Sequence, residues 1–169
     1  MANRNTQGFG LIAAGALGST PATSGQGKYK IDAGYGTTLF HGGAVASAAG
    51  YIVDGQTTDA PILGVLNGIF YNAATTLKPT FANHYVQVTP ANSEDIDAFV
   101  FDNPTQQYVV STDAAVAQAG YLETYDMNTS AGSTTTGQSS ATLDIADTSA
   151  DAASWRLLRS AEDPENDEN

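Results

Sequence analysis

The chain has 169 residues, no cysteine and a formal net charge of −12, with 18 Asp and Glu against 6 Lys and Arg. This length fits a single domain, and the lack of cysteine excludes disulfide bonds and thiolate metal ligands. Because binding to nucleic-acid phosphates needs clustered Lys and Arg, so acidic a chain is not expected to bind nucleic acid.

The N-terminal residues 1–26 are rich in Gly, Ala, Ser and Thr and show neither helical nor strand periodicity. Glycines interrupt their apolar run, and only Arg4 precedes it, so the pattern favours an extended N-terminal arm over a cleaved signal sequence. No apolar stretch approaches the ~18 residues that a membrane-spanning helix needs, and we expect no membrane partner.

Short runs typical of β-strands follow, separated by turn residues. They predict an all-β fold with little helix, a single small β-barrel or β-sandwich domain over residues 27–160. The predicted strands cover residues 28–31, 37–41, 44–46, 51–53, 61–71, 85–88, 97–101, 107–112, 121–127, 141–145 and 155–159.

The most apolar run, residues 61–71, is apolar at both alternating sets of positions, which predicts a central strand buried on both sides. Gly64 and Gly68 within it indicate a bulge or a close backbone approach. Further along, the Asn103-Pro104 turn predicts a hairpin between 97–101 and 107–112. The only helix candidate is a short turn within residues 114–119.

Charge is unevenly distributed along the chain. No Lys or Arg occurs between residues 79 and 154, whereas residues 161–169 hold five carboxylates. Such a block is typical of a solvated tail, so we predict an acidic C-terminal tail over 161–169.

No motif for catalysis or metal binding stands out. The two histidines, His41 and His84, form no recognised metal-binding pattern. An acidic group within residues 94–102 has oxygen ligands suited to calcium but lacks the spacing of a calcium-binding loop. Its members are Glu94, Asp95, Asp97 and Asp102. We therefore expect no catalytic residues, no resident metal and no cofactor.

Several segments, in this order, are similar to the capsid decoration (head cement) proteins of tailed bacteriophages. They are Gly8-Phe9-Gly10, residues 28–37, residues 62–71, Asp102-Asn103-Pro104, residues 154–158 and residues 162–166. The resemblance implies a β-rich protein that sits on the outer surface of the phage head, binds the major capsid protein and often forms trimers.

The sequence thus predicts a virion structural protein, not an enzyme, that stabilises the capsid lattice as a homo-oligomer, with a trimer favoured. Phe9, Leu11 and Ile12 are the candidates for capsid anchoring. The candidates for self-association are Phe70, Tyr71 and Trp155. Two alternatives stay open: another virion component, such as a tail, fibre or vertex protein, or a secreted β-domain that binds a ligand or calcium.

Overall fold

The computed structural model describes residues 8–18, 25–55, 61–128, 132–146 and 154–161. Within these residues the protein is mostly β-sheet with almost no helix (5%), which confirms the expected all-β class. The helical content consists of two 3₁₀ turns, η1 (Ala91–Ser93) and η2 (Gln118–Gly120). The second turn overlaps the end of the helix candidate. Of the expected acidic tail, only Ala161 lies within the described residues.

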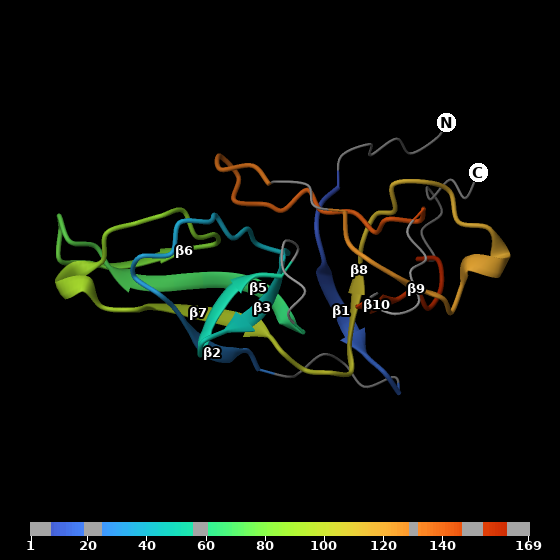
Figure 1. Cartoon of the computed structure of the whole chain (residues 1–169), viewed down its shortest axis with the longest axis horizontal. Coiled ribbons are helices and arrows are strands. Elements are labelled where there is room, and N and C mark those ends of the chain that lie inside the picture. Colours follow the sequence, from blue (N-terminus) through green and yellow to red (C-terminus); the bar gives the residue numbers. More distant parts are fainter. Residues whose placement is uncertain (1–7, 19–24, 56–60, 129–131, 147–153, 162–169) are drawn as a thin grey trace.

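The larger sheet has six antiparallel strands and forms one end of an elongated molecule, the main lobe (Figure 1). Its spatial order is β2-β7-β5-β3-β4, with β6 also paired to β5. The strands are β2 (Gly27–Ile31), β3 (Ala44–Ala48), β4 (Tyr51–Asp54), β5 (Ile62–Asn72), β6 (Pro79–Ala82) and β7 (Ile96–Phe101). Because β5 pairs with β7 along one edge and with β3 and β6 along the other, it is the expected central strand.

Two glycines of β5 allow its neighbours to approach closely. A Cβ atom at Gly64 would collide with the carbonyl of Phe101 on β7. The ladder between β5 and β7 shifts register between Leu66 and Gly68, which marks a bulge. The bulge and the close approach expected at these glycines are therefore confirmed.

One face of this sheet, here called the core face, encloses the main hydrophobic core. The core consists of Ile31, Leu39, Val45, Ile52, Leu66, Ile69, Tyr85, Ile96, Ala98 and Val100. The sheet curls strongly, because β2 and β4, at opposite ends of its order, also contact one another. Among the described residues no ladder joins these two strands, so the sheet is not a closed barrel.

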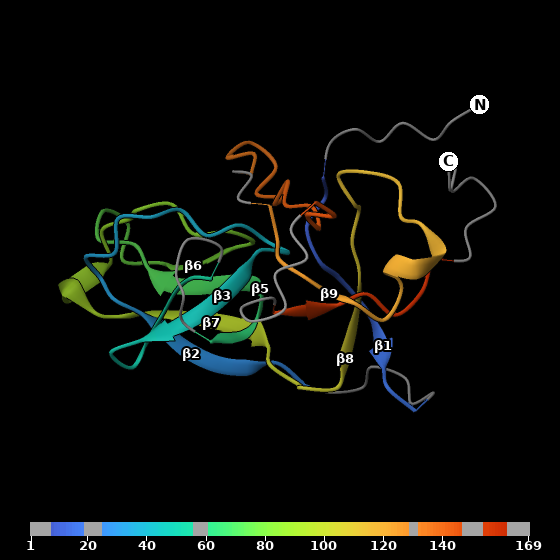
Figure 2. The ribbon, with the colours of Figure 1, turned by 45° about the vertical axis from the view of Figure 1, so that its right-hand side comes forward.

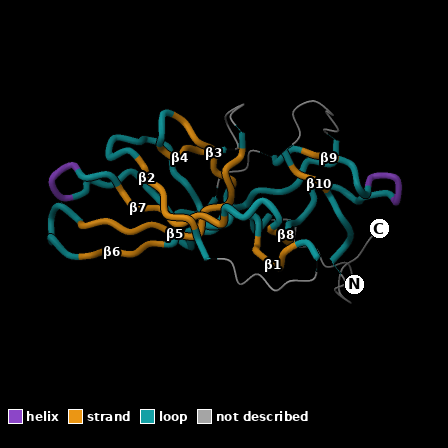
Figure 3. Tube along the Cα trace, turned by 90° about the horizontal axis from the view of Figure 1, so that it is seen from below, coloured by secondary structure: helices purple, strands orange, loops and turns teal. Residues whose placement is uncertain are grey.

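Two short antiparallel ribbons form the other end of the molecule, the second lobe (Figures 2 and 3). Strand β1 (Ile12–Ala16) pairs with β8 (Gln106–Val109), and β9 (Thr124–Tyr125) pairs with β10 (Trp155–Arg156). A second core cluster joins the lobes, since Leu11 from the second lobe is buried with Ala44 and Val65 of the main sheet.

The predicted hairpin between residues 97–101 and 107–112 is wrong. Strand β7 lies between β2 and β5, while β8 pairs with β1 in the second lobe. Both edges of β7 are thus occupied, and β8 has no edge of β7 left to pair with. The turn after Asn103 instead leads the chain from one lobe to the other, closed by a 3.0 Å hydrogen bond from the Gln106 amide to the Asn103 carbonyl.

The N-terminal segment also differs from the expectation. Residues 8–18 of the predicted arm take part in the fold, where residues 12–16 form β1 and Leu11 is buried. Residues 1–7 and 19–24 lie outside the described part of the chain. The physical reason is that β8 offers a free edge to β1, and the second core accommodates the Leu11 side chain.

Other expected strands are shorter than predicted. Residues 37–41 and 85–88 form no strand: they contribute a bridge between Leu39 and Tyr85 and one between His41 and Gln138. The 141–145 run contributes bridges of Leu143 to Thr112 and Met127. Strand β6, by contrast, was not predicted, because it is only four residues long and begins with proline.

Candidate interaction surfaces

The N-terminal segment is fastened to two loops by backbone hydrogen bonds. The Leu11 amide donates to the Gly42 carbonyl at 2.8 Å, and the Gly10 amide donates to the Ala141 carbonyl at 3.2 Å. The Gln138 side-chain amide donates to the Phe9 carbonyl at 2.6 Å. Residues 9–11 are therefore hydrogen-bonded both to the loop at Gly42 and to the loop at residues 138–141.

The three predicted anchoring residues have different environments. The Leu11 side chain is 4% exposed and belongs to the second core, so its role within the chain is packing. Phe9 is half-buried. Ile12 is 48% exposed and is the only one of the three whose side chain is largely open to solvent.

The β1–β8 ribbon presents an open surface. Ile12 lies directly opposite Val109, which is also exposed, and side chains of directly opposite residues share one face of a ribbon. Among the described residues each strand has a ladder only with the other, so no strand lies along its second edge there, where a further strand could pair. The ribbon thus combines an exposed apolar pair with two open edges.

A row of aromatic side chains crosses the face of the main sheet opposite the core face, here called the outer face. Phe70 on β5 lies opposite Phe81 on β6, with ring centroids 4.7 Å apart. The ring of Phe81 also stacks with that of Phe99 on β7, at 6.4 Å and an interplanar angle of 18°. We call these three residues the aromatic stripe. Phe81 is 73% exposed, which is unusual for so large an apolar side chain.

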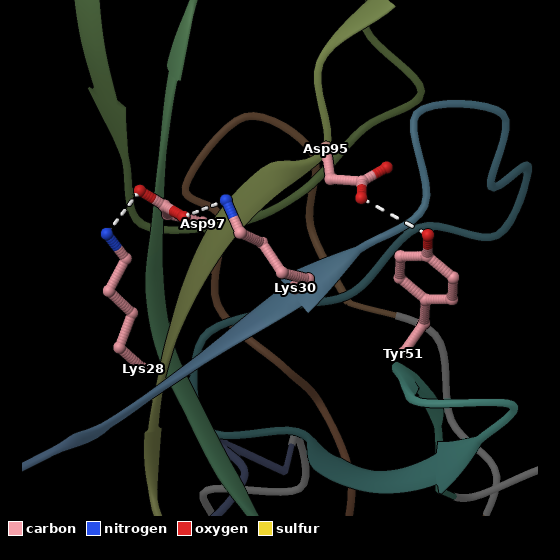
Figure 4. A network of polar contacts seen from close by, with 5 residues as sticks. All are labelled: Lys28, Lys30, Tyr51, Asp95 and Asp97. Atoms are coloured by element: carbon pink, nitrogen blue, oxygen red, sulfur yellow. Dashed lines mark hydrogen bonds and ion pairs between the residues drawn. The ribbon is translucent and has the colours of Figure 1, made fainter.

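Two lysines and one carboxylate border the aromatic stripe. The Nζ atoms of Lys28 and Lys30 approach the two carboxylate oxygens of Asp97 at 2.7 and 2.6 Å, from either side (Figure 4). Burial of Asp97 disfavours its charged form, but the hydrogen bonds and charges of the two lysines outweigh this and lower its pKa below the usual value. The hydrogen bond to Asp97 likewise raises the pKa of Lys30.

The three residues predicted to mediate self-association lie apart. Phe70 belongs to the aromatic stripe on the outer face, whereas the next residue, Tyr71, packs against the main core. Trp155 packs against the second core, with its ring edge-on to Tyr108 at a centroid distance of 5.7 Å. Of the three, only Phe70 lies on the aromatic stripe.

Sequence reasoning missed Phe81, the most exposed member of the stripe. Its strand was not predicted, and the stripe arises only because β6 and β7 flank β5 in space. The one available signal was the alternation in 97–101, which places Phe99 on the face opposite Val100.

The acidic group in residues 94–102 does not converge on one point. The Tyr51 hydroxyl donates to Asp95 at 3.2 Å (Figure 4), and the Tyr29 hydroxyl donates to Asp102 at 2.6 Å, while Asp97 faces the lysines. In the parts of the chain that the structure describes, no three acidic or histidine side chains gather as metal ligands would. Neither helical turn in the described part of the chain is long or apolar enough to span a bilayer.

The chain matches no known protein-family model, no curated protein and no solved structure. Function is therefore inferred from the two surfaces described above, the β1–β8 ribbon and the outer face with its aromatic stripe.

Proposed function

We propose that this protein is a virion structural protein that binds the outside of an icosahedral phage head and stabilises the capsid lattice. In this role its partner is the major capsid protein, it acts as a homo-oligomer with a trimer favoured, and it needs neither catalysis nor a cofactor. The proposal extends the resemblance of its ordered segments to head decoration proteins.

The observation that carries the proposal is the open β1–β8 ribbon. An exposed strand edge can bind a strand of another protein through main-chain hydrogen bonds, which need no particular side chain on the partner. The exposed pair of Ile12 and Val109 adds apolar contact at the same place. In this proposal the ribbon binds the capsid, Ile12 makes direct contact, and Leu11 holds the ribbon against the main sheet.

A compact domain suits a protein that coats a shell. We propose that the main lobe is a partly open barrel, because β2 and β4 approach one another and the core face points inward. Its contacts repeat over a symmetric lattice, so weak individual binding adds up through multivalency. The net charge of −12 favours solubility of crowded, decorated particles.

The test uses undecorated heads and the full chain. The double variant Ile12→Asp, Val109→Asp places two charges on the ribbon surface and should weaken binding to heads at least about tenfold, since a charge buried in an interface without a partner is costly. Bound protein is measured by co-sedimentation with heads, and folding by circular dichroism.

Leu122→Asp is the matched control, because Leu122 is 66% exposed and lies elsewhere on the second lobe. It should bind heads as the wild type does. Full occupancy by the folded double variant would refute the ribbon as the capsid contact. Saturation of wild-type protein at only a few copies per particle would favour a tail, fibre or vertex protein instead.

A further inference from the structure

The outer face of the main sheet is covered at one end and open at the other. Val65, Gly68 and Phe70 of β5 lie opposite Phe101, Phe99 and Asp97 of β7, which alternate along that strand and therefore share one face. At the Val65 end, Leu11 and Trp155 of the second lobe cover this face. At the Phe70 end, the described part of the chain leaves Phe81 exposed. The same apolar face that joins the two lobes thus continues into solvent.

In the exposed part, the aromatic rings of neighbouring strands lie close together. Gly68 carries no side chain between β6 and β7, so the rings of Phe81 and Phe99 approach one another across β5. On the far side of β7, Lys28 lies opposite Phe99, and Lys30 lies opposite Asp97. An apolar centre with a charged border is the usual anatomy of a protein–protein contact.

Charge argues for a second copy of this chain as the occupant. Two chains of net charge −12 repel one another over most of their surfaces. Two of the six basic residues of the chain border the aromatic stripe, and their side chains are 59% and 50% exposed. Repulsion between copies is therefore reduced at this face. The lysines of one copy can also pair with carboxylates of the next, because the chain carries 18 Asp and Glu.

We propose that the outer face, centred on Phe70, Phe81 and Phe99 and bordered by Lys28 and Lys30, is the surface through which copies of this chain associate. This inference rests on the proposed function, to whose homo-oligomer it gives a contact surface. Of the residues expected to mediate self-association, it retains Phe70 and assigns Tyr71 and Trp155 to packing within the chain.

The test measures self-association of the full chain in the absence of heads, by analytical ultracentrifugation over a range of concentrations. Phe81→Asp should raise the dissociation constant at least about tenfold, as loss of a central aromatic anchor does. Leu122→Asp is the matched control, with a similar exposure and the same added charge, and should associate as the wild type does. Lys28→Glu should weaken association as well, and less so at high salt, where charges are screened.

Three outcomes would overturn the inference. A wild-type chain that stays monomeric at all concentrations would do so and would leave capsid binding untouched, because heads can bind monomers. Equal association of folded Phe81→Asp and the wild type would also overturn the inference. If that variant then failed to bind heads, the aromatic stripe would be a capsid contact instead. An equal loss in Leu122→Asp would show a general effect of charge. If Phe81→Asp fails to fold, Phe81→Ser and Lys28→Glu decide the question by the same criteria.

Discussion

Asp97 shows how much one side chain can depend on its neighbours. Its carboxylate is only 13% exposed, yet two lysines reach it from β2 and keep it charged. The lysine side chains themselves are largely exposed, so water screens the attraction and each pair contributes modestly. We expect Asp97→Asn to lower the free energy of unfolding by about 1 kcal/mol at neutral pH, measured by denaturant titration.

The stability difference between the wild type and Asp97→Asn should decrease as the pH falls. Because the folded state lowers the pKa of Asp97, its contribution is present above the unfolded pKa and is lost as pH falls through the folded value. The gap between wild type and Asp97→Asn should therefore shrink below about pH 4. Glu123→Gln, at an exposed carboxylate of the second lobe, serves as the control and should change little. A gap that persists undiminished at pH 3 would mean that charge is not its cause.

At the scale of elements, the N-terminal segment is held by a close backbone contact. Gly10 has φ +73°, and a Cβ atom there would lie 2.6 Å from the Gly42 carbonyl oxygen. Gly15, in the adjoining strand β1, has open space around it. Gly10→Ala should therefore lower the free energy of unfolding by about 1–3 kcal/mol, whereas Gly15→Ala should stay within about 1 kcal/mol of the wild type.

Thermal unfolding compares the two glycine variants, and amide hydrogen exchange locates the change. Faster exchange is expected first in β1 and β8 of Gly10→Ala, whereas β5 and β7 should lose protection only by the decrease in global stability. Equal stability of the two variants would contradict the close packing of residues 8–11 against the loop at Gly42.

Strands were predictable from the sequence where a local pattern decides the structure. The long apolar run of β5 and the runs at 44–46 and 51–53 carry their own signals, and all three formed strands as expected. Pairing between distant segments was not predictable, because the order β2-β7-β5 and the β1–β8 ribbon depend on which edges remain free. Strand β1 escaped detection since Gly and Ala dilute its alternation, and the buried state of Leu11 depends on Ala44 and Val65.

The same limit applies to the candidate surfaces. Phe70 was identified from its strand alone, but its neighbours Phe81 and Phe99 come from strands 11 and 29 residues further along the chain. Adjacent residues of one strand point to opposite faces, so Phe70 and Tyr71 cannot serve one surface together. The sheet order is needed only to bring Phe81 and Phe99 beside Phe70.

At the scale of the whole molecule, one small cluster couples the lobes. Leu11 contributes from the second lobe, and Ala44 and Val65 contribute from the main sheet. Trp155, the single tryptophan, packs on this cluster and reports on the second lobe by its fluorescence. Far-UV circular dichroism reports mainly on the larger sheet. Because both lobes share the cluster, the two signals should change together in denaturant, as in a two-state transition.

Leu11→Ala and Ile12→Ala form a matched pair that tests this coupling. The first removes a buried side chain and leaves a cavity, which should cost about 2–5 kcal/mol. The second removes a side chain that is 48% exposed and should cost less than about 1 kcal/mol. In Leu11→Ala both signals should shift to lower denaturant concentration by the same amount, because the cavity weakens a contact that both lobes need. A shift of the Trp155 signal alone would show that the lobes unfold independently and that the cluster does not couple them.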